Sequence, residues 1–153
     1  MPVLEAIRIT KAFEEGRQST PVLHGVDLAL EPGEIVALEG PSGSGKTTLL
    51  QILGCILSPS GGELRLNGSS IRGKPADLAG IRRQSIGFVF QQFNLFPALT
   101  ARENVQYALN LKGVPGIRAR QEAGALLESV DLGDRMEFLP RDLSGGQKQR
   151  VAI

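Results

Sequence analysis

A glycine-rich loop between an apolar run and a helical pattern constrains this chain more than any other feature. Residues 40–47 read Gly-Pro-Ser-Gly-Ser-Gly-Lys-Thr and match G-x-x-x-x-G-K-[ST] at every fixed position. The apolar run before the loop, residues 35–38, predicts a strand buried on both faces. The residues after the loop are apolar at helical spacing and predict a helix that ends near residues 59–62. Strand, glycine-rich turn and helix in this order predict an α/β protein with a P-loop.

The composition of this loop suits a triphosphate. Glycines let the main chain turn sharply and approach an anion, so that several backbone N–H groups can point inward. The first turn of the following helix adds further N–H groups and a favourable dipole. Lys46 supplies a positive charge for the β/γ-phosphates, and the Thr47 hydroxyl is a ligand for Mg²⁺. We therefore expect ATP and Mg²⁺ to bind at the residues of this loop, which are Gly40, Pro41, Ser42, Gly43, Ser44, Gly45, Lys46, Thr47 and Thr48.

A second glycine cluster, residues 143–147, reads Leu-Ser-Gly-Gly-Gln and precedes a basic, Gln/Arg-rich helix start. A serine and two glycines at a helix N-terminus form a second surface suited to anions. With this cluster the chain resembles the ATP-binding cassette (ABC) transporter family, whose signature loop reads LSGGQ. The resemblance implies that two copies pair head to tail and that each signature contacts the ATP of the other copy. The residues concerned are Ser144, Gly145, Gly146 and Gln147.

Two further residues fall where this family has functional side chains. Gln91, at the end of the apolar run 86–90, matches the glutamine of the Q-loop. The resemblance implies that Gln91 acts in catalysis with Lys46, lies toward Mg²⁺ and the attacking water, and transmits the nucleotide state to the transport subunit. Phe13 lies upstream of Gly40 where the family has an aromatic ring that stacks on adenine. An aromatic residue at such a position is otherwise more often part of a core.

Patterns along the rest of the chain predict further strands and helices. Strands are expected over residues 3–10, 26–30 and 86–90, and a strand over 63–66 enters a tight turn at Asn67-Gly68. A short helix is expected over 77–83. Two more helices are expected, one opened by a capping box at Thr100 and one stopped near Gly133.

Together with the resemblance, these elements imply an α/β fold with a P-loop NTPase (RecA-like) core, an antiparallel β subdomain and a small α-helical subdomain. The β subdomain and P-loop core are expected over residues 1–92 and the helical subdomain over 93–143. Residues 144–153 hold the signature loop and the start of its helix.

Charge and composition restrict the class of partner. The chain has 17 basic and 16 acidic residues, which are interspersed, so no nucleic-acid partner is expected. Cys55 is the single cysteine, so an intramolecular disulfide is impossible and a reducing compartment is expected. No apolar segment is long enough to cross a bilayer, and residues 1–20 lack a secretory signal. Any membrane connection must therefore come through another chain. The resemblance implies a cytoplasmic and peripheral location, on the inner face of the cell membrane through a permease.

Residues 86–97 and 99–105 look like the branch of the family that serves lipoprotein release and macrolide or antimicrobial-peptide export. This implies an ATP-binding subunit that couples ATP binding and hydrolysis to export or lipoprotein release through a separate membrane permease. Residues 93–97, apolar around Asn94, are the predicted surface for that permease. The alternatives are a non-transport ABC-type nucleotide-binding module, regulatory or for DNA maintenance, and a non-functional remnant. The transported substrate contacts the permease and cannot be read from these residues.

The family's Asp-Glu pair, which follows the signature at the end of an apolar strand, does not occur within these residues, nor does its switch histidine. We therefore expect a cassette truncated after the signature and incomplete at its C-terminus. The strand expected over 35–38 would then have an unpaired apolar edge. The polypeptide alone is expected to be poorly soluble, to bind ATP weakly and not to hydrolyse it.

Overall fold

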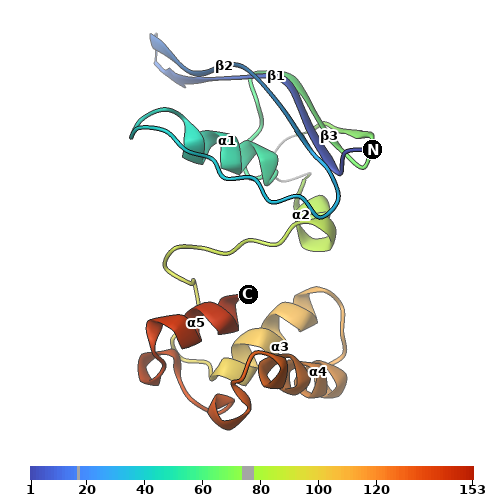
Figure 1. Cartoon of the computed structure of the whole chain (residues 1–153), viewed down its shortest axis with the longest axis vertical. Helices are drawn as coiled ribbons and strands as arrows, with labels where there is room; N and C mark the ends of the chain where they lie inside the picture. Colours follow the sequence, from blue (N-terminus) through green and yellow to red (C-terminus); the bar gives the residue numbers. More distant parts are fainter. Residues whose placement is uncertain (17, 74–77) are drawn as a thin grey trace. The chain divides into compact units, whose positions relative to one another are not determined.

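The structure is a computed structural model that describes residues 1–16, 18–73 and 78–153. These residues form two compact units, Met1–Ile86 and Gly87–Ile153, each with its own hydrophobic core (Figure 1). The division lies between Ile86 and Gly87, whereas the sequence placed the boundary between residues 92 and 93. Residues 87–92 form no strand, so they do not extend the sheet of the first unit.

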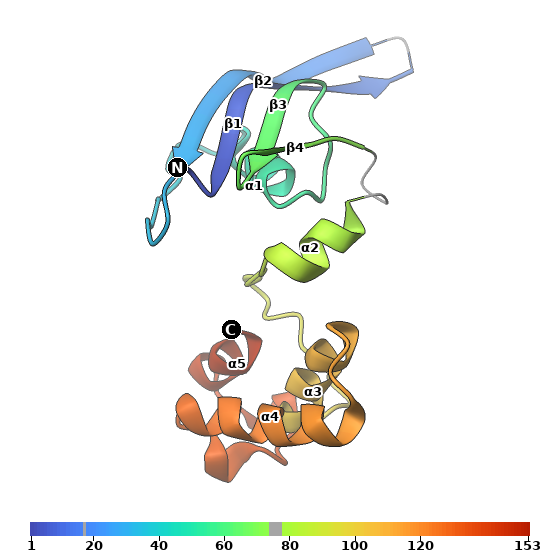
Figure 2. The same cartoon turned by 90° about the vertical axis from the view of Figure 1, so that its right-hand side faces the viewer.

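The first unit contains a four-stranded antiparallel sheet in the order β2-β1-β3-β4 (Figure 2). In β2, Val26, Leu28 and Leu30 are half-buried and alternate with exposed residues, as the sequence predicted. The two-residue turn between β3 and β4 is formed by Asn67 and Gly68, whose φ angles of 49° and 76° are both positive, as tight hairpin turns require. The strands are β1 (Leu4–Glu15), β2 (Gln18–Leu30), β3 (Gly61–Leu66) and β4 (Ser69–Ile71).

Helix α1 (Lys46–Leu53) packs its buried Leu49 and Ile52 against the sheet, where Ile9 and Leu64 belong to the same core. The helix is shorter than predicted. Its C-cap is Gly54, and the following Cys55 has a φ of 57°, outside the helical region. The apolar pattern that predicted the helix continued to residue 56, beyond the end of α1. The reason is that Cys55 and its neighbours lie in or near the core although they are no longer helical.

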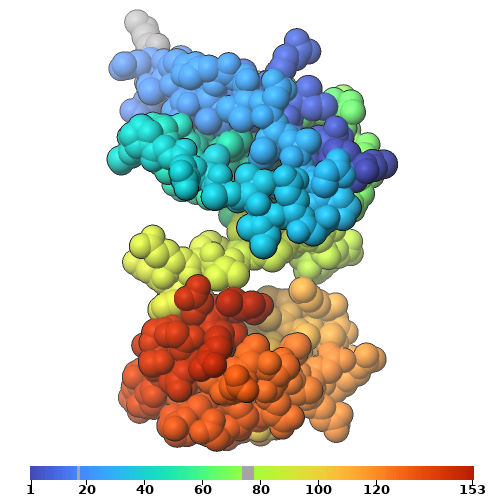
Figure 3. Space-filling model, in the orientation of Figure 1, coloured from blue at the N-terminus to red at the C-terminus, as the bar shows by residue number. Residues whose placement is uncertain are grey.

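The strands predicted over residues 35–38 and 86–90 are not formed. Ile35 is 97% exposed, although residues 35–38 were expected to be buried, and Val89 of the second segment is 56% exposed. The physical reason is that a strand requires a neighbouring strand to accept and donate its backbone hydrogen bonds. Within the described residues, neither segment has such a partner. Figure 3 shows the segment between β2 and α1, in light blue to cyan, on the surface of the first unit.

The short helix expected over residues 77–83 is observed as α2 (Ala79–Ser85); Asp77 lies outside the described residues. Arg82 is half-buried on this helix. Its Nη1 donates a hydrogen bond to the carbonyl of Cys55 at 2.7 Å, so α2 is tied to the residues that follow α1.

The second unit is helical, as predicted. Its largest helices are α3 (Ala101–Leu111) and α4 (Gly116–Ser129), and the buried Leu127, Leu132 and Leu143 belong to its core. The capping box of α3 is present, with Thr100 Oγ1 accepting from Glu103 N at 3.2 Å and Thr100 N donating to Glu103 Oε2 at 2.8 Å. In the parts of the chain that the structure describes, no helix has the length and apolar character that crossing a bilayer requires. The remaining elements are η1 (Gly133–Arg135), η2 (Pro140–Asp142) and α5 (Gly145–Ala152).

Candidate nucleotide site

The glycine-rich loop of the first unit has the backbone conformation of a cradle. Gly40, Gly43 and Gly45 have φ angles of 148°, 82° and 86°, a region in which side chains other than glycine are strained. Gly45 is also packed tightly, because a Cβ there would lie 2.9 Å from Leu23 Cδ2 and 3.2 Å from Val22 O. The base of the loop is thus fixed against β2, and the sequence of the loop sets its shape.

Helix α1 begins at Lys46 and has no side-chain cap, because its N-cap residue is Gly45. The N–H groups of its first turn therefore donate no hydrogen bond to a capping side chain, which leaves them suited to an anion. Thr47, the second residue of the helix, is exposed. Its hydroxyl is an oxygen ligand of the kind that Mg²⁺ prefers, alongside phosphate oxygens. The cradle and its threonine thus fit both ATP and Mg²⁺.

The Lys46 ammonium lies over the loop. Its Nζ donates to the carbonyl oxygens of Gly40 at 2.7 Å and Pro41 at 2.6 Å, and contacts Ser44 Oγ at 3.3 Å. An ammonium group has three donors. The two short bonds to carbonyls hold the charge in position, and the long contact with Ser44 is the weakest of the three.

Phe13 lies on β1, opposite Thr20 of β2, in the same unit as the loop. Phe13 is 39% exposed, so it is not buried in the core. The Nζ of Lys11 lies 5.2 Å from the centre of this ring. Sequence reasoning missed Lys11, although a spacing of two residues along a strand places two side chains on the same face.

The signature residues belong to the second unit. Ser144 is the N-cap of α5, and its Oγ accepts from Gln147 N at 3.3 Å. The Gln147 side chain returns a hydrogen bond, since its Oε1 accepts from Ser144 N at 2.8 Å. The Gln147 side chain thus serves the cap, while Gly145 and Gly146 are exposed and a Cβ at either would meet no atom within 4 Å.

Gln91 also belongs to the second unit and is exposed in a turn. The following residues Phe93 and Asn94 both have positive φ, 60° and 51°. Phe93 is a bulky residue in a conformation that costs about 1 kcal/mol or more. The chain just after Gln91 is therefore held in a strained arrangement.

The buried side-chain amide of Asn104, which the sequence reasoning missed, supports the chain from Phe96 to Thr100. Asn104 is 8% exposed; its Oδ1 accepts from Phe96 N at 2.7 Å, and its Nδ2 donates to three carbonyl oxygens at 2.9–3.2 Å. The three acceptors belong to Phe96, Leu99 and Thr100. The sequence feature that could have revealed this role is an asparagine inside the first turn of a predicted helix. Asparagine is unfavourable at such a position unless its side chain bonds to nearby backbone groups.

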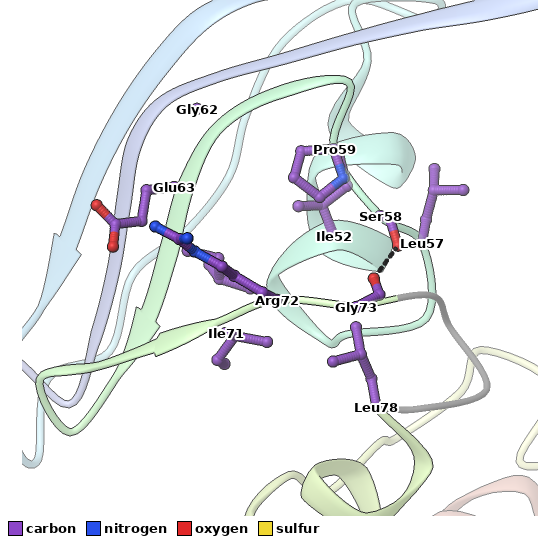
Figure 4. A pocket seen from close by; sticks show the side chains of 11 residues that line it. Ile52, Leu57, Ser58, Pro59, Gly62, Glu63, Ile71, Arg72, Gly73 and Leu78 are labelled. Atoms are coloured by element: carbon purple, nitrogen blue, oxygen red, sulfur yellow. Dashed lines mark hydrogen bonds between the residues drawn. The ribbon is translucent and has the colours of Figure 1, made fainter.

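A pocket in the first unit holds none of the predicted residues (Figure 4). It has a volume of about 320 Å³ and lies between β3, β4 and the end of α1. Ser58 Oγ donates to Gly73 O at 3.0 Å beside it. Its polar lining includes Glu63 and Arg72, and the hydrogen bond from Arg65 to Glu63 lowers the pKa of the Glu63 carboxyl.

Comparison with known proteins assigns the family. The family described as ABC transporter matches residues 23–153. The chain is 48% identical over 153 residues to the macrolide export ATP-binding/permease protein MacB of Marinobacter nauticus, covering 99% of this chain and 24% of that protein. It is 46% identical to YknY of Bacillus subtilis, an uncharacterized ABC transporter ATP-binding protein, of which it spans 66%.

Comparison with solved structures supports the same family. An ATP-binding cassette solved as a dimer in a post-hydrolysis state with ADP and Pi superimposes with a TM-score of 0.83 at 40% identity. The match covers 97% of this chain and 66% of that one. The sequence motifs, the two units and these matches lead to the same conclusion: the chain has the fold of a P-loop ATPase cassette and belongs to the ABC transporter family.

Proposed function

We propose that this chain is the ATP-binding part of an ABC transporter that couples ATP binding and hydrolysis to export or lipoprotein release through a membrane permease. The observation that carries the proposal is the position of the Lys46 ammonium, held by two carbonyl oxygens at 2.6 and 2.7 Å over a loop of positive-φ glycines. Such a group lies ready for the β/γ-phosphates of a nucleotide and loses little freedom on binding.

Each residue of the cradle has a distinct role in this proposal. Backbone N–H groups of the loop and of the first turn of α1 bind phosphate oxygens, and Lys46 neutralises their charge. Thr47 holds Mg²⁺ together with phosphate oxygens. When bound there, Mg²⁺ would offset the charge that develops during phosphoryl transfer. Gln91 positions the attacking water and relays the nucleotide state to the permease.

The signature loop supplies a second binding surface in a head-to-tail dimer. Ser144, Gly145 and Gly146 are exposed at the start of α5, where backbone N–H groups and the helix dipole favour a phosphate. The Ser144 hydroxyl accepts a hydrogen bond from Gln147 N, and its own proton is left to donate to a phosphate oxygen. Gln147 contributes by holding the cap rather than by direct contact.

The permease binds at residues 93–97 in this proposal, at the inner face of the membrane. Phe96 is 49% exposed and its ring makes an edge-to-face contact with Tyr107, with 4.9 Å between the ring centres. Exposed aromatic groups of this kind are enriched at protein interfaces. Relatives named as macrolide export ATP-binding/permease proteins support both export and this partner. Assembly with the permease that survives charge substitutions at Phe93 and Phe96 would refute this part.

The nucleotide site is tested by isothermal titration of the purified protein with Mg-ATP. Lys46→Ala should weaken ATP binding at least about tenfold, because a charge-assisted contact with phosphate is lost. Lys112→Ala is the matched control, since it removes an exposed lysine of the second unit and should leave binding unchanged. Equal ATP affinity in the wild type and Lys46→Ala would contradict the proposed site.

A further inference from the structure

Three consecutive residues of β1 are fixed to the segment that follows helix α1. Ser60 N donates to Thr10 O at 2.8 Å, Lys11 Nζ donates to Ser58 O at 2.9 Å, and Ala12 N donates to Ser60 Oγ at 3.0 Å. Phe13 is the next residue along the strand. The strand just before Phe13 is thus tied to the residues beyond the helix that begins at the phosphate loop.

Lys11 differs from its neighbours because its anchor is a side chain. The stem is half-buried, and the ammonium lies 5.2 Å from the centre of the Phe13 ring while it donates to Ser58 O. The carbonyl of Ser58 thus holds the cation beside the ring. The ammonium therefore places a positive charge over one face of the ring. Phe13 as a whole is 39% exposed, so the residue is not enclosed by the core.

A cation at one face changes what the other face can bind. The faces of an aromatic ring are negative, so two stacked rings repel each other through their faces. A cation draws electron density toward itself and reduces this repulsion at the opposite face. A purine, which is rich in π electrons, then stacks more favourably on the phenyl ring.

We propose that Lys11 is a positioning residue for the nucleotide base: anchored on Ser58 O, its ammonium holds and polarises the Phe13 ring, so that ATP is preferred over a phosphate chain without a base. This rests on the proposed function, because it requires ATP at the phosphate loop. Lys11 touches no phosphate in this proposal and acts through Phe13 alone.

The readout is the ratio of ATP affinity to inorganic tripolyphosphate affinity, measured by titration calorimetry on the same protein sample in Mg²⁺ buffer. Lys11→Met keeps the aliphatic stem and removes the charge, and should lower this ratio about two- to fivefold. Lys11→Arg retains a cation that can stack on the ring and should restore most of the ratio. Lys112→Met is the matched control and should leave the ratio at the wild-type value.

A double-mutant cycle with Phe13→Leu tests whether Lys11 acts through the ring. In the Phe13→Leu background, Lys11→Met should lower the ratio no further. The proposal is overturned if Lys11→Met leaves the ratio unchanged, if it weakens ATP and tripolyphosphate equally, or if its effect persists without the ring. Thermal unfolding of each variant separates these results from misfolding, and Lys11→Arg provides the folded comparison if Lys11→Met is unstable.

Failure of the proposed function gives a different result. In that case the wild-type protein binds neither ATP nor tripolyphosphate in a manner that depends on Lys46, and the base proposal is overturned with it. Wild-type binding that depends on Lys46 but not on Lys11 overturns the base proposal alone.

Discussion

Asn104→Ala should be among the most destabilising single substitutions in the helical unit. The side chain is 8% exposed and makes four hydrogen bonds to the backbone around the turn before α3. Two of its partners keep another bond after truncation. Thr100 O still accepts from the backbone N of residue 104, and Phe96 O still accepts from Leu99 N.

The other two partners, Phe96 N and Leu99 O, lose the hydrogen bond to the Asn104 side chain, and no second bond to either atom is seen within the described residues. An unsatisfied group in a partly buried site costs about 1–1.5 kcal/mol. Two such groups predict a loss of about 2–3 kcal/mol in the free energy of unfolding, less a few tenths regained through the higher helix propensity of alanine. In urea this corresponds to a midpoint about 1–2 M lower.

The assay is urea unfolding of the purified protein followed by circular dichroism. Asn110→Ala is a matched control, because residue 110 is an exposed asparagine on the same helix and its replacement should change stability by less than about 0.5 kcal/mol. If Asn104→Ala unfolds at the same urea concentration as Asn110→Ala, the four hydrogen bonds do not support this turn and the reasoning is refuted.

Three further outcomes are expected. Gly45→Ala should disrupt ATP binding more than Gly43→Ala, since both strain a positive φ but only at Gly45 does the added Cβ meet atoms within 3.2 Å; equal titration curves would contradict this. Hydrogen bonds from Thr100 lower the pKa of the Glu103 carboxyl in the folded protein. The ionised carboxylate therefore stabilises the fold above its unfolded pKa, and this stabilisation is lost as pH falls through the lower folded pKa. The difference in unfolding free energy between wild type and Glu103→Ala, measured in urea, should shrink from pH 7 to pH 3. Burial raises the pKa of the Cys55 thiol, so a disulfide reagent at pH 8 should modify it slowly until urea is added, and rapid modification of the native protein would count against its burial.

Much of the candidate site was predictable because its residues lie next to one another in the chain. The phosphate loop, the capping box at Thr100 and the tight turn at Asn67-Gly68 each depend on a few consecutive residues. The cap that Ser144 and Gln147 form has the same local character, although the sequence suggested phosphate contact for Gln147 rather than a bond to Ser144 N.

The strands predicted over residues 35–38 and 86–90 show where the same reasoning fails. Both are apolar and β-prone, yet neither is hydrogen-bonded as a strand in the described parts of the chain. A helix satisfies its own backbone, whereas a strand depends on residues from elsewhere. The apolar pattern of residues 35–38 therefore shows that the segment is suited to a buried strand. It does not show whether a neighbouring strand is present to pair with it.

The sequence by itself determined the phosphate loop, the capping box at Thr100 and membership of the ABC transporter family, because each depends on short runs of consecutive residues. Only the tertiary structure decided that Lys11 is held on Ser58 O beside Phe13, and that Asn104 binds the turn from Phe96 to Leu99. These contacts depend on how the chain returns to itself in space. Lys11 meets a carbonyl group 47 residues away, whereas Asn104 meets carbonyl groups four to eight residues before it. In both cases the residue type does not show which carbonyl group the side chain will meet.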